Sequence, residues 1–273
     1  MEQKSVIIIT GGASGIGKYL AKSLAKQGHY LMVTDIQEET LQYLAQNENW
    51  ASEQVITSQL DVISPENWQT VIDQTLDKWK RIDVLMNVAG ICVPGNIQDT
   101  PFELIDMHID INLKGVIYGS RLVAPVMIKQ RQGHIINIAS LAGVAPVKGM
   151  SLYSASKFGV RGFSLAIAHE LKDQGVAVSV VCPDAVDTPM LDKIAGYKEA
   201  ALTFSGGRIL TVEDIGQVIL KKALGKKKME VLYPASRGFY AKLGSFFTGL
   251  SGTVTNILSK KGAKKQAKLQ AKR

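Results

Sequence analysis

The chain has 273 residues, 46% of them hydrophobic, which is enough for one domain with a large core. Its formal charge of +8 lies almost entirely in residues 260–273, which hold seven basic side chains and no acidic one, while the rest has 25 basic and 24 acidic residues. The body of the protein therefore gives no sign of a basic groove, and no nucleic-acid partner is expected.

Cysteine usage and the amino terminus indicate the compartment. Cys92 and Cys182 lie far apart and belong to no Cys-x-x-Cys or Cys/His cluster, so we expect reduced thiols and no metal site. The amino-terminal residues run directly into an apolar strand, without the hydrophobic stretch of a secretory signal. A cytoplasmic protein is expected.

Seven short apolar runs alternate with longer segments that have helical periodicity or helix-boundary signals. This alternation predicts an α/β fold of parallel β-α-β units, and the lack of strict polar alternation predicts a sheet covered by helices on both faces. We expect one domain of about seven strands over residues 1–235, followed by a carboxyl-terminal appendage. The predicted strands are Val6–Ile9, Tyr30–Thr34, Val55–Leu60, Val84–Val88, Ile135–Ala139, Val176–Val181 and Met229–Tyr233.

A glycine-rich turn, Thr10-Gly-Gly-Ala-Ser-Gly-Ile-Gly17, follows the first strand and opens the first predicted helix. Glycine lets the backbone turn tightly and approach a pyrophosphate, while the helix amino terminus offers free N–H groups and a partial positive charge. The helix is expected to begin near Gly15 and to stop at Gly28. The expected cofactor contacts of the turn are Gly11, Ser14, Gly15, Ile16 and Gly17.

Asp35 ends the second strand, 18 residues after Gly17. At that place a carboxylate can accept hydrogen bonds from both hydroxyls of an adenosine ribose. It would also repel a 2′-phosphate, and neither Ser14 nor Ile36 supplies a compensating positive charge. The sequence therefore favours NAD over NADP.

Two more strands end in residues that are suited to contact a dinucleotide. Asp61 and Val62 follow the third strand, and Asn87-Val-Ala-Gly90 closes the fourth, where loops would contact adenine and ribose. An Asp after a strand is also a common cap or turn former, and this alternative stays open for Asp61. The expected cofactor contacts in the fourth-strand motif are Asn87, Ala89 and Gly90.

A tyrosine and a lysine are spaced for one helix face, 13 residues beyond a serine that ends the fifth strand. Tyr153 and Lys157 stand at i and i+4, so the ammonium can lie beside the phenol and favour its ionised form. Ser140 would face the crevice where open α/β sheets bind ligands. Taken alone, Tyr-x-x-x-Lys is more often an ordinary pair on a helix surface.

Taken together, these features are specific: Thr10–Gly17, Asp61, Asn87–Gly90, Asn112, Ser140, Tyr153 and Lys157. With them the chain closely resembles the short-chain dehydrogenase/reductase family, over roughly residues 5–235. The resemblance implies a doubly wound, mostly parallel seven-stranded sheet of the Rossmann type. It also implies a nicotinamide cofactor, NAD here, and an oxidoreductase that exchanges a hydride between an alcohol and a ketone or aldehyde.

The resemblance also implies catalytic roles for four residues. Tyr153 would be the general acid/base at the substrate oxygen, and Ser140 would hydrogen-bond that oxygen. Lys157 would lower the tyrosine pKa and hold the nicotinamide ribose, and Asn112 would support a water-linked proton path from the lysine. The alternative for Asn112 is an amide on the surface of a helix or capping it.

Two positions depart from the family pattern. Val88 replaces the second asparagine of the fourth-strand motif, and Asp184 replaces the glycine that usually follows Pro183. If that backbone position needs a positive φ, Asp tolerates it at some cost. Val186 and Thr188 still match the positions that usually contact the nicotinamide carboxamide.

The segment 185–210 covers the substrate in this family, and here it is mostly apolar. We expect a small-molecule substrate of lipophilic character, such as a hydrophobic secondary alcohol. The alternatives are a loop that packs its own apolar residues, a small polar alcohol or 3-oxoacyl substrate, or an idle cofactor-sensing protein. The family commonly forms homodimers and homotetramers. The apolar residues are Met190, Leu191, Ile194, Ala195, Tyr197, Leu202 and Phe204.

The appendage divides in two. Residues 236–259 predict an amphipathic helix, and 260–273 a flexible basic tail. Two interpretations stay open: residues 240–273 contact a membrane surface, or the helix packs on the body or on another subunit. The apolar stripe consists of Leu243, Phe246, Phe247, Leu250, Val254, Ile257 and Leu258.

Overall fold

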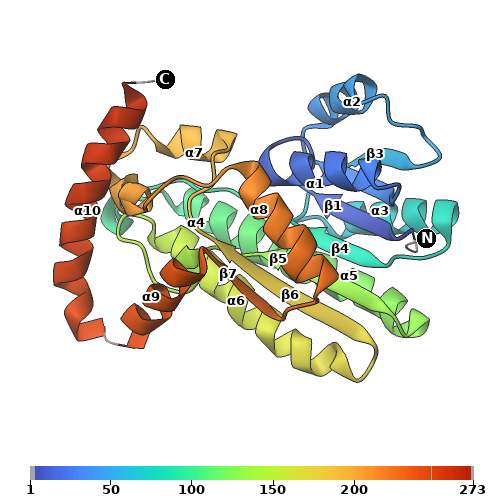
Figure 1. The fold of residues 1–273 in the computed structure, drawn as a ribbon. Coiled ribbons are helices and arrows are strands. Elements are labelled where there is room, and N and C mark those ends of the chain that lie inside the picture. Colours follow the sequence, from blue (N-terminus) through green and yellow to red (C-terminus); the bar gives the residue numbers. More distant parts are fainter. Residues whose placement is uncertain (1–3, 247, 272–273) are drawn as a thin grey trace.

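The predicted strands form one seven-stranded sheet in which all neighbours are parallel, in the order β3-β2-β1-β4-β5-β6-β7 (Figure 1). This computed structural model describes residues 4–246 and 248–271, of which 248–256 are described by their backbone alone. The prediction of a doubly wound Rossmann-type sheet is confirmed. The strands are β1 (Val6–Thr10), β2 (Tyr30–Asp35), β3 (Val55–Gln59), β4 (Val84–Asn87), β5 (Gly133–Ile138), β6 (Val176–Pro183) and β7 (Glu230–Tyr233).

Helices cover both faces of the sheet. The α-helices are α1 (Gly15–Lys26), α2 (Glu38–Asn47), α3 (Pro65–Trp79), α4 (Phe102–Ile109), α5 (Gly115–Gln130), α6 (Ser151–Lys172), α7 (Pro189–Ile194), α8 (Val212–Val218), α9 (Ala235–Phe246) and α10 (Thr248–Gln270). Shorter turns are 3₁₀-helical in η1 (Ile97–Asp99), η3 (Leu141–Gly143) and η4 (Lys198–Ser205), and π-helical in η2 (Asp110–Lys114) and η5 (Ile219–Gly225).

Alternating side chains of β1 pack into two different cores, one on each face of the sheet. Ile7 and Ile9 pack in the core that contains residues of α1, α2 and α8, whereas Ile8 packs with residues of α3, α5 and α6. All three side chains are fully buried. Because successive residues of a strand point to opposite faces, a strand buried on both faces must be apolar throughout, as this run is.

The order of the strands places a crevice beside β1. The chain runs outward from β1 to β3 on one side and then from β4 to β7 on the other. Ligands of open α/β sheets bind at such a reversal, outside the carboxyl ends of the strands. The glycine-rich turn follows β1 and the Asn87–Gly90 motif closes β4, so both predicted cofactor segments border the crevice.

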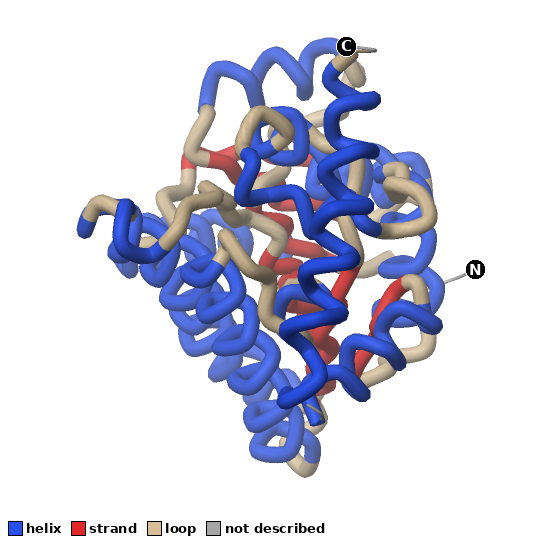
Figure 2. Tube along the Cα trace, turned by 90° about the vertical axis from the view of Figure 1, so that its left-hand side faces the viewer, coloured by secondary structure: helices blue, strands red, loops and turns tan. Residues whose placement is uncertain are grey.

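The carboxyl-terminal segment differs from the flexible tail expected for residues 260–273. Helix α10 continues to Gln270 and packs along η4. It runs down the left side of the molecule in Figure 1, which is the side that faces the viewer in Figure 2. The Gln266 amide, 6% exposed, donates to the carbonyl oxygens of Ala195 and Tyr197 at 2.8 and 2.7 Å. At Gly262 a Cβ would collide with the Ala201 carbonyl, so the glycine permits the close approach. A polar side chain and a glycine thus dock the helix on the body. The number of apolar residues in the segment could not predict this contact.

The apolar stripe of the appendage is largely on the outside where the structure describes its side chains. Phe246 is 84% exposed and Ile257 is 63% exposed. Phe247, Leu250 and Val254 lie outside the described side chains. None of the described helices is both long and apolar enough to cross a bilayer.

Candidate active site

Helix α6 and the end of β5 bring the three predicted catalytic side chains together. The Ser140 hydroxyl hydrogen-bonds the Tyr153 phenol. The Lys157 ammonium lies 5.7 Å from the centroid of the tyrosine ring and donates a 3.0 Å hydrogen bond to the Ile138 carbonyl oxygen. A phenol, a hydroxyl and a cation therefore share one site at the carboxyl edge of the sheet, in which Lys157 is buried and Ser140 and Tyr153 are half-buried.

Burial dominates the electrostatics of this group. Burial raises the pKa of the Tyr153 phenol, the Cys92 thiol acts in the same direction, and the hydrogen bond from Ser140 lowers it. Burial also lowers the pKa of Lys157 to about 8. The direction for the tyrosine is opposite to the sequence prediction, because burial disfavours the charged phenolate more strongly than its neighbours favour it.

Asn112 lies in the π-helical turn η2 and is completely buried, not exposed on a helix. Its side-chain oxygen accepts from the Ile91 N–H at 2.8 Å, and its amide nitrogen donates to the Ile91 carbonyl at 2.9 Å and to the Ser156 hydroxyl at 3.1 Å. A Cβ at Gly90 would lie 2.9 Å from the Asn112 oxygen and 3.4 Å from the Lys157 ammonium. The asparagine therefore lies beside the lysine without lining the cavity.

The glycine-rich turn leaves room and N–H donors for a pyrophosphate. Gly11 and Gly15 have positive φ angles of 69° and 50°, and a Cβ at Gly17 would collide with the Gly11 carbonyl. Ser14, at the N-cap of α1, makes no side-chain capping bond in the described structure. Gly15 faces Thr188 across the crevice, where a Cβ would lie 3.1 Å from the threonine methyl. The turn thus fits the phosphates of a dinucleotide.

Asp35 is held at the mouth of the same crevice. One carboxylate oxygen accepts from the Ala13 N–H and the other from the Gln37 N–H, each at 3.0 Å. A carboxylate has about four acceptor positions, so both oxygens can still accept from ribose hydroxyls. The adjoining cavity residues Ile36 and Gln37 are uncharged. The two acceptor oxygens of Asp35 and its uncharged neighbours therefore fit the hydroxyls of an adenosine ribose.

The other predicted cofactor residues divide between the cavity and the body. Asn87 points into the body, where its amide donates to the Asn137 oxygen at 2.8 Å, and it does not line the cavity. Asp61 does line it, but its carboxylate also accepts from the Ile63 N–H at 3.1 Å in a turn, as the alternative predicted. The predicted residues that line the cavity are Gly11, Ser14, Gly15, Ile16, Gly17, Asp35, Asp61, Val62, Ala89, Gly90, Ser140, Tyr153, Lys157, Val186 and Thr188.

Thr10 is a supporting residue to which the sequence gave no individual role. Its hydroxyl oxygen accepts hydrogen bonds from the N–H groups of Val88 and Ala89 at 3.0 and 3.1 Å. It therefore holds the end of β4 beside the glycine-rich turn. The Val88 side chain packs against the core, which explains how valine is accommodated in place of the usual asparagine.

Asp184 does not adopt the positive φ considered from sequence. Its carboxylate instead forms an ion pair with Arg237 of α9, with 2.5 Å between Oδ2 and Nε. Burial raises the pKa of Asp184, and the arginine opposes that effect. Both residues line the cavity. The contact joins residues far apart in the chain, and no sequence motif points to Arg237.

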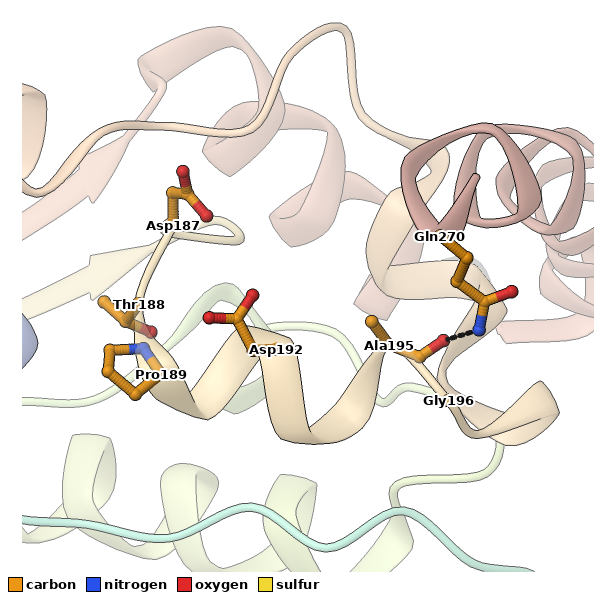
Figure 3. Close-up of a pocket in the computed structure, with 7 residues that line it drawn as sticks. All are labelled: Asp187, Thr188, Pro189, Asp192, Ala195, Gly196 and Gln270. Carbon is orange, nitrogen blue, oxygen red and sulfur yellow. Dashed lines mark hydrogen bonds between the residues drawn. The ribbon is translucent and has the colours of Figure 1, made fainter. Parts of the chain in front are cut away.

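One cavity of about 1680 Å³ connects the cofactor crevice to the carboxyl-terminal helices. A second, of about 680 Å³, lies on the outer side of α7, where Gln270 of α10 donates to the Ala195 carbonyl at 2.5 Å (Figure 3). Among residues 4–246 and 248–271, no group of His, Cys, Asp or Glu could hold a metal ion. Apolar residues of the large cavity beyond Tyr153 are Cys92, Val147, Met150, Met190, Leu191, Ile194, Leu202, Leu243 and Leu258.

Comparisons with known proteins agree with this geometry. Residues 5–198 match the short chain dehydrogenase family. An uncharacterised oxidoreductase of Staphylococcus saprophyticus is 37% identical over 69% of this chain and 81% of its own length. A 3-oxoacyl-(acyl-carrier-protein) reductase of Thermotoga maritima is 36% identical over 79% of this chain and 88% of its own.

Solved structures agree as well. A short chain dehydrogenase/reductase from Burkholderia phymatum, crystallised in complex with NAD, covers 91% of this chain and 95% of its own length, with 25% identity and a TM-score of 0.81. Levodione reductase covers 86% of this chain and 97% of its own, with 26% identity and a TM-score of 0.77. The family match ends at residue 198, before α8, α9 and α10.

Proposed function

This chain belongs to the short chain dehydrogenase family of nicotinamide-dependent oxidoreductases, and we propose that it transfers a hydride between NAD and a lipophilic secondary alcohol or its ketone. The observation that carries the proposal is the position of the Ser140–Tyr153 pair in the cavity. The pair lies between a crevice shaped for a dinucleotide and an apolar chamber.

The polar groups of this site suit proton transfer at a substrate oxygen. Ser140 would donate a hydrogen bond to that oxygen. Tyr153, after its own proton has left along a path beside Lys157, would take the alcohol proton during oxidation and return it during reduction. Lys157 places a positive charge one helical turn away, which favours loss of the phenol proton. Bound NAD would supply the hydride acceptor. Asn112 lies beside the lysine and would support a proton path.

The choice of NAD follows from Asp35. Its carboxylate is fixed by two backbone N–H groups at the crevice mouth, and no positive charge adjoins it at Ile36 or Gln37. A 2′-phosphate would therefore meet a negative charge that nothing beside it offsets, whereas ribose hydroxyls would find acceptors. The residues Gly11, Gly15 and Gly17 would receive the pyrophosphate, and Val186 and Thr188 the carboxamide.

A substrate panel tests the proposal. The purified protein should form NADH from hydrophobic secondary alcohols of eight or more carbons, with kcat/KM at least tenfold above that for 2-propanol, because the chamber is lined by apolar side chains. NADH absorbance at saturating NAD measures the rates. A preference for short polar alcohols would contradict the lipophilic substrate. A preference for a 3-oxoacyl thioester would instead favour the activity named for the Thermotoga maritima relative.

We also propose that α10 contacts an anionic membrane surface. Ile257 and four exposed lysines, Lys260, Lys261, Lys264 and Lys268, follow the spacing of one helix face. Gly262 and Gln266, on the opposite face, dock the helix on the body. An apolar residue among lysines suits acidic lipid headgroups, to which each lysine adds about 1 kcal/mol.

Vesicle sedimentation tests the membrane contact. The full chain should sediment with vesicles of 30% phosphatidylserine and not with neutral ones. Changing all four lysines to glutamine should lower the binding constant at least tenfold. Glutamine at four exposed lysines elsewhere, Lys26, Lys78, Lys129 and Lys172, is the matched control and should retain binding. Equal loss in both variants, or a dimer interface formed by this face, would contradict the proposal. The expected homodimer or homotetramer stays a prediction.

A further inference from the structure

One wall of the apolar chamber is a segment that we call the lid, residues 189–205. It consists of α7 and η4. Its apolar residues that line the cavity include Met190, Leu191, Ile194 and Leu202. The position of the lid therefore sets the shape of the space that would hold the carbon chain of the substrate.

The helices of the lid are short. Helix α7 has six residues, and η4 has eight residues in the 3₁₀ conformation, whose hydrogen bonds have poorer geometry than those of an α-helix. Isolated helices of fewer than about 12 residues are marginal in water. The buried apolar residues of the lid also belong to a small cluster that is separate from the two cores of the sheet. The lid therefore depends on contacts from other segments.

Helix α10 supplies hydrogen-bond donors where α7 meets η4. The Gln266 amide donates to the carbonyl oxygens of Ala195, the C-cap of α7, and Tyr197, the N-cap of η4, at 2.8 and 2.7 Å. The Gln270 amide donates to the same Ala195 oxygen (Figure 3). The last carbonyls of a helix have no partner within that helix, so these side chains satisfy groups that the lid leaves open.

The same helix also contacts the middle and the far end of η4. The Lys265 ammonium donates to the carbonyl oxygen of Gly206, the residue that follows η4. Gly262 approaches η4 so closely that a Cβ would collide with the Ala201 carbonyl. Both ends of η4 and its centre are thus in contact with α10.

The contacts belong to one face of α10. Gly262, Gln266 and Leu269 share a face by their spacing. Gln266 is 6% exposed, and a buried amide is costly to leave without partners. Leu269 packs against the apolar cluster of the lid, and Tyr153 packs against the same cluster. This face of α10 is therefore fitted to the lid by hydrogen bonds, close approach and apolar contact together.

We propose that α10 is a clasp that holds the lid over the chamber, and that Gln266 is its positioning residue. Gln266 does not line the large cavity, and it acts through the backbone of Ala195 and Tyr197. The proposal rests on the proposed function and adds that the affinity for long apolar substrates depends on a helix beyond the family match, which ends at residue 198.

The geometry predicts an effect on substrate binding and not on the chemical step. Ser140, Tyr153 and Lys157 are carried by the end of β5 and by α6, whereas Gln266 holds the lid. A loosened lid loses apolar contacts with the substrate, and a longer carbon chain has more such contacts to lose. The effect should therefore grow with the length of the alcohol.

Hydrogen exchange and kinetics of Gln266→Met in the full-length protein test the clasp. Methionine keeps the length of the side chain but cannot donate to the two carbonyl oxygens. The backbone amides of residues 198–205 should exchange at least tenfold faster. The KM for 2-decanol should rise at least fivefold while kcat stays within twofold, and the KM for 2-propanol should change less than twofold.

Gly262→Ala disturbs the same contact by a different route. The added Cβ would push α10 away from the Ala201 carbonyl, whereas alanine favours the helix itself. Faster lid exchange and a raised KM for 2-decanol in this variant could then not be assigned to a weakened α10. If one of the two variants fails to fold, the other decides.

The matched controls are the same substitutions at exposed positions of other helices. Gln69 donates to Asp73 at 2.8 Å on α3, and a Cβ at Gly162 on α6 would meet nothing within 4 Å. Gln69→Met and Gly162→Ala should leave the lid exchange, kcat and KM unchanged. Similar changes in these controls would overturn the proposal.

Two other results would also overturn it. Unchanged lid exchange in both Gln266→Met and Gly262→Ala excludes a clasp, whatever the activity. An equal fall of kcat/KM for 2-propanol and 2-decanol, or a loss carried by kcat alone, shows a general structural role.

Calorimetry keeps the clasp and the proposed reaction distinguishable. 2-Decanol is titrated in the presence of NADH, which cannot accept a hydride, so binding is measured without turnover. Weaker binding in the variants with faster lid exchange supports the clasp even if no alcohol is oxidised, in which case only the proposed reaction fails. If the unchanged chain binds no 2-decanol, the proposed substrate class fails, and the exchange comparison alone decides the clasp.

Discussion

Replacing Tyr153 with phenylalanine should lower kcat/KM for alcohol oxidation by about 10³-fold, since general acid/base catalysis contributes that order of rate. The ring keeps its packing, and only the hydroxyl that hydrogen-bonds Ser140 is removed. Because burial disfavours the phenolate, the phenol is uncharged and the substitution removes no charge. The melting temperature should therefore change little. Steady-state NADH formation and thermal unfolding measure the two effects.

The matched control for this change is Tyr43→Phe. Tyr43 is 66% exposed on α2 and should retain full activity. A Tyr153→Phe protein with more than a tenth of the original rate would contradict the proposed proton transfer. A melting temperature lowered by ten degrees or more would assign the loss to folding, and Ser140→Ala would then provide the independent measure of the catalytic centre.

Replacing Asp35 with asparagine should reduce the preference for NADH over NADPH at least tenfold. The change removes the negative charge that would repel a 2′-phosphate and leaves one amide oxygen where two carboxylate oxygens accept from Ala13 and Gln37. We expect weaker NADH binding and somewhat tighter NADPH binding. Fluorescence titration of both reduced cofactors gives the two dissociation constants without depending on turnover.

The control for Asp35→Asn is the same substitution at a carboxylate outside the cofactor crevice. Asp73→Asn, on the exposed side of α3, should leave both dissociation constants unchanged. If the unchanged protein binds NADPH as tightly as NADH, the assignment of NAD is wrong. If Asp35→Asn alters both affinities by the same factor, the carboxylate serves to shape the glycine-rich turn and not to discriminate between cofactors.

Local patterns predicted the parts of the site that are made by single elements. A glycine-rich turn between a strand and a helix has one geometry, and residues at i and i+4 share a helix face. Thr10–Gly17 and the Tyr153–Lys157 pair were therefore visible in sequence. Asn87 was misplaced because the pattern marks the end of β4 without saying which way the side chain points, and it points to Asn137.

Local patterns could not predict the pKa of a buried group or the contacts between distant segments of the chain. The spacing of Lys157 predicted a lowered pKa for Tyr153, but the depth of burial reverses the direction. The lysine-rich composition of 260–273 predicted a flexible tail, but Gln266 and Gly262 dock the helix on the backbone of Ala195 and Ala201. In each case the deciding quantity is the surroundings of a side chain, which depend on residues elsewhere in the chain.

The sequence by itself determined the parallel α/β fold, the family, and the serine, tyrosine and lysine of the proposed centre, because each depends on short-range periodicity or spacing. Only the tertiary structure decided the depth of the phenol, the course of α10 and the meeting of Asp184 with Arg237. Burial and ion pairing are set by distances between segments that the chain order does not encode locally. Those distances shape the chamber in which we propose that the substrate binds.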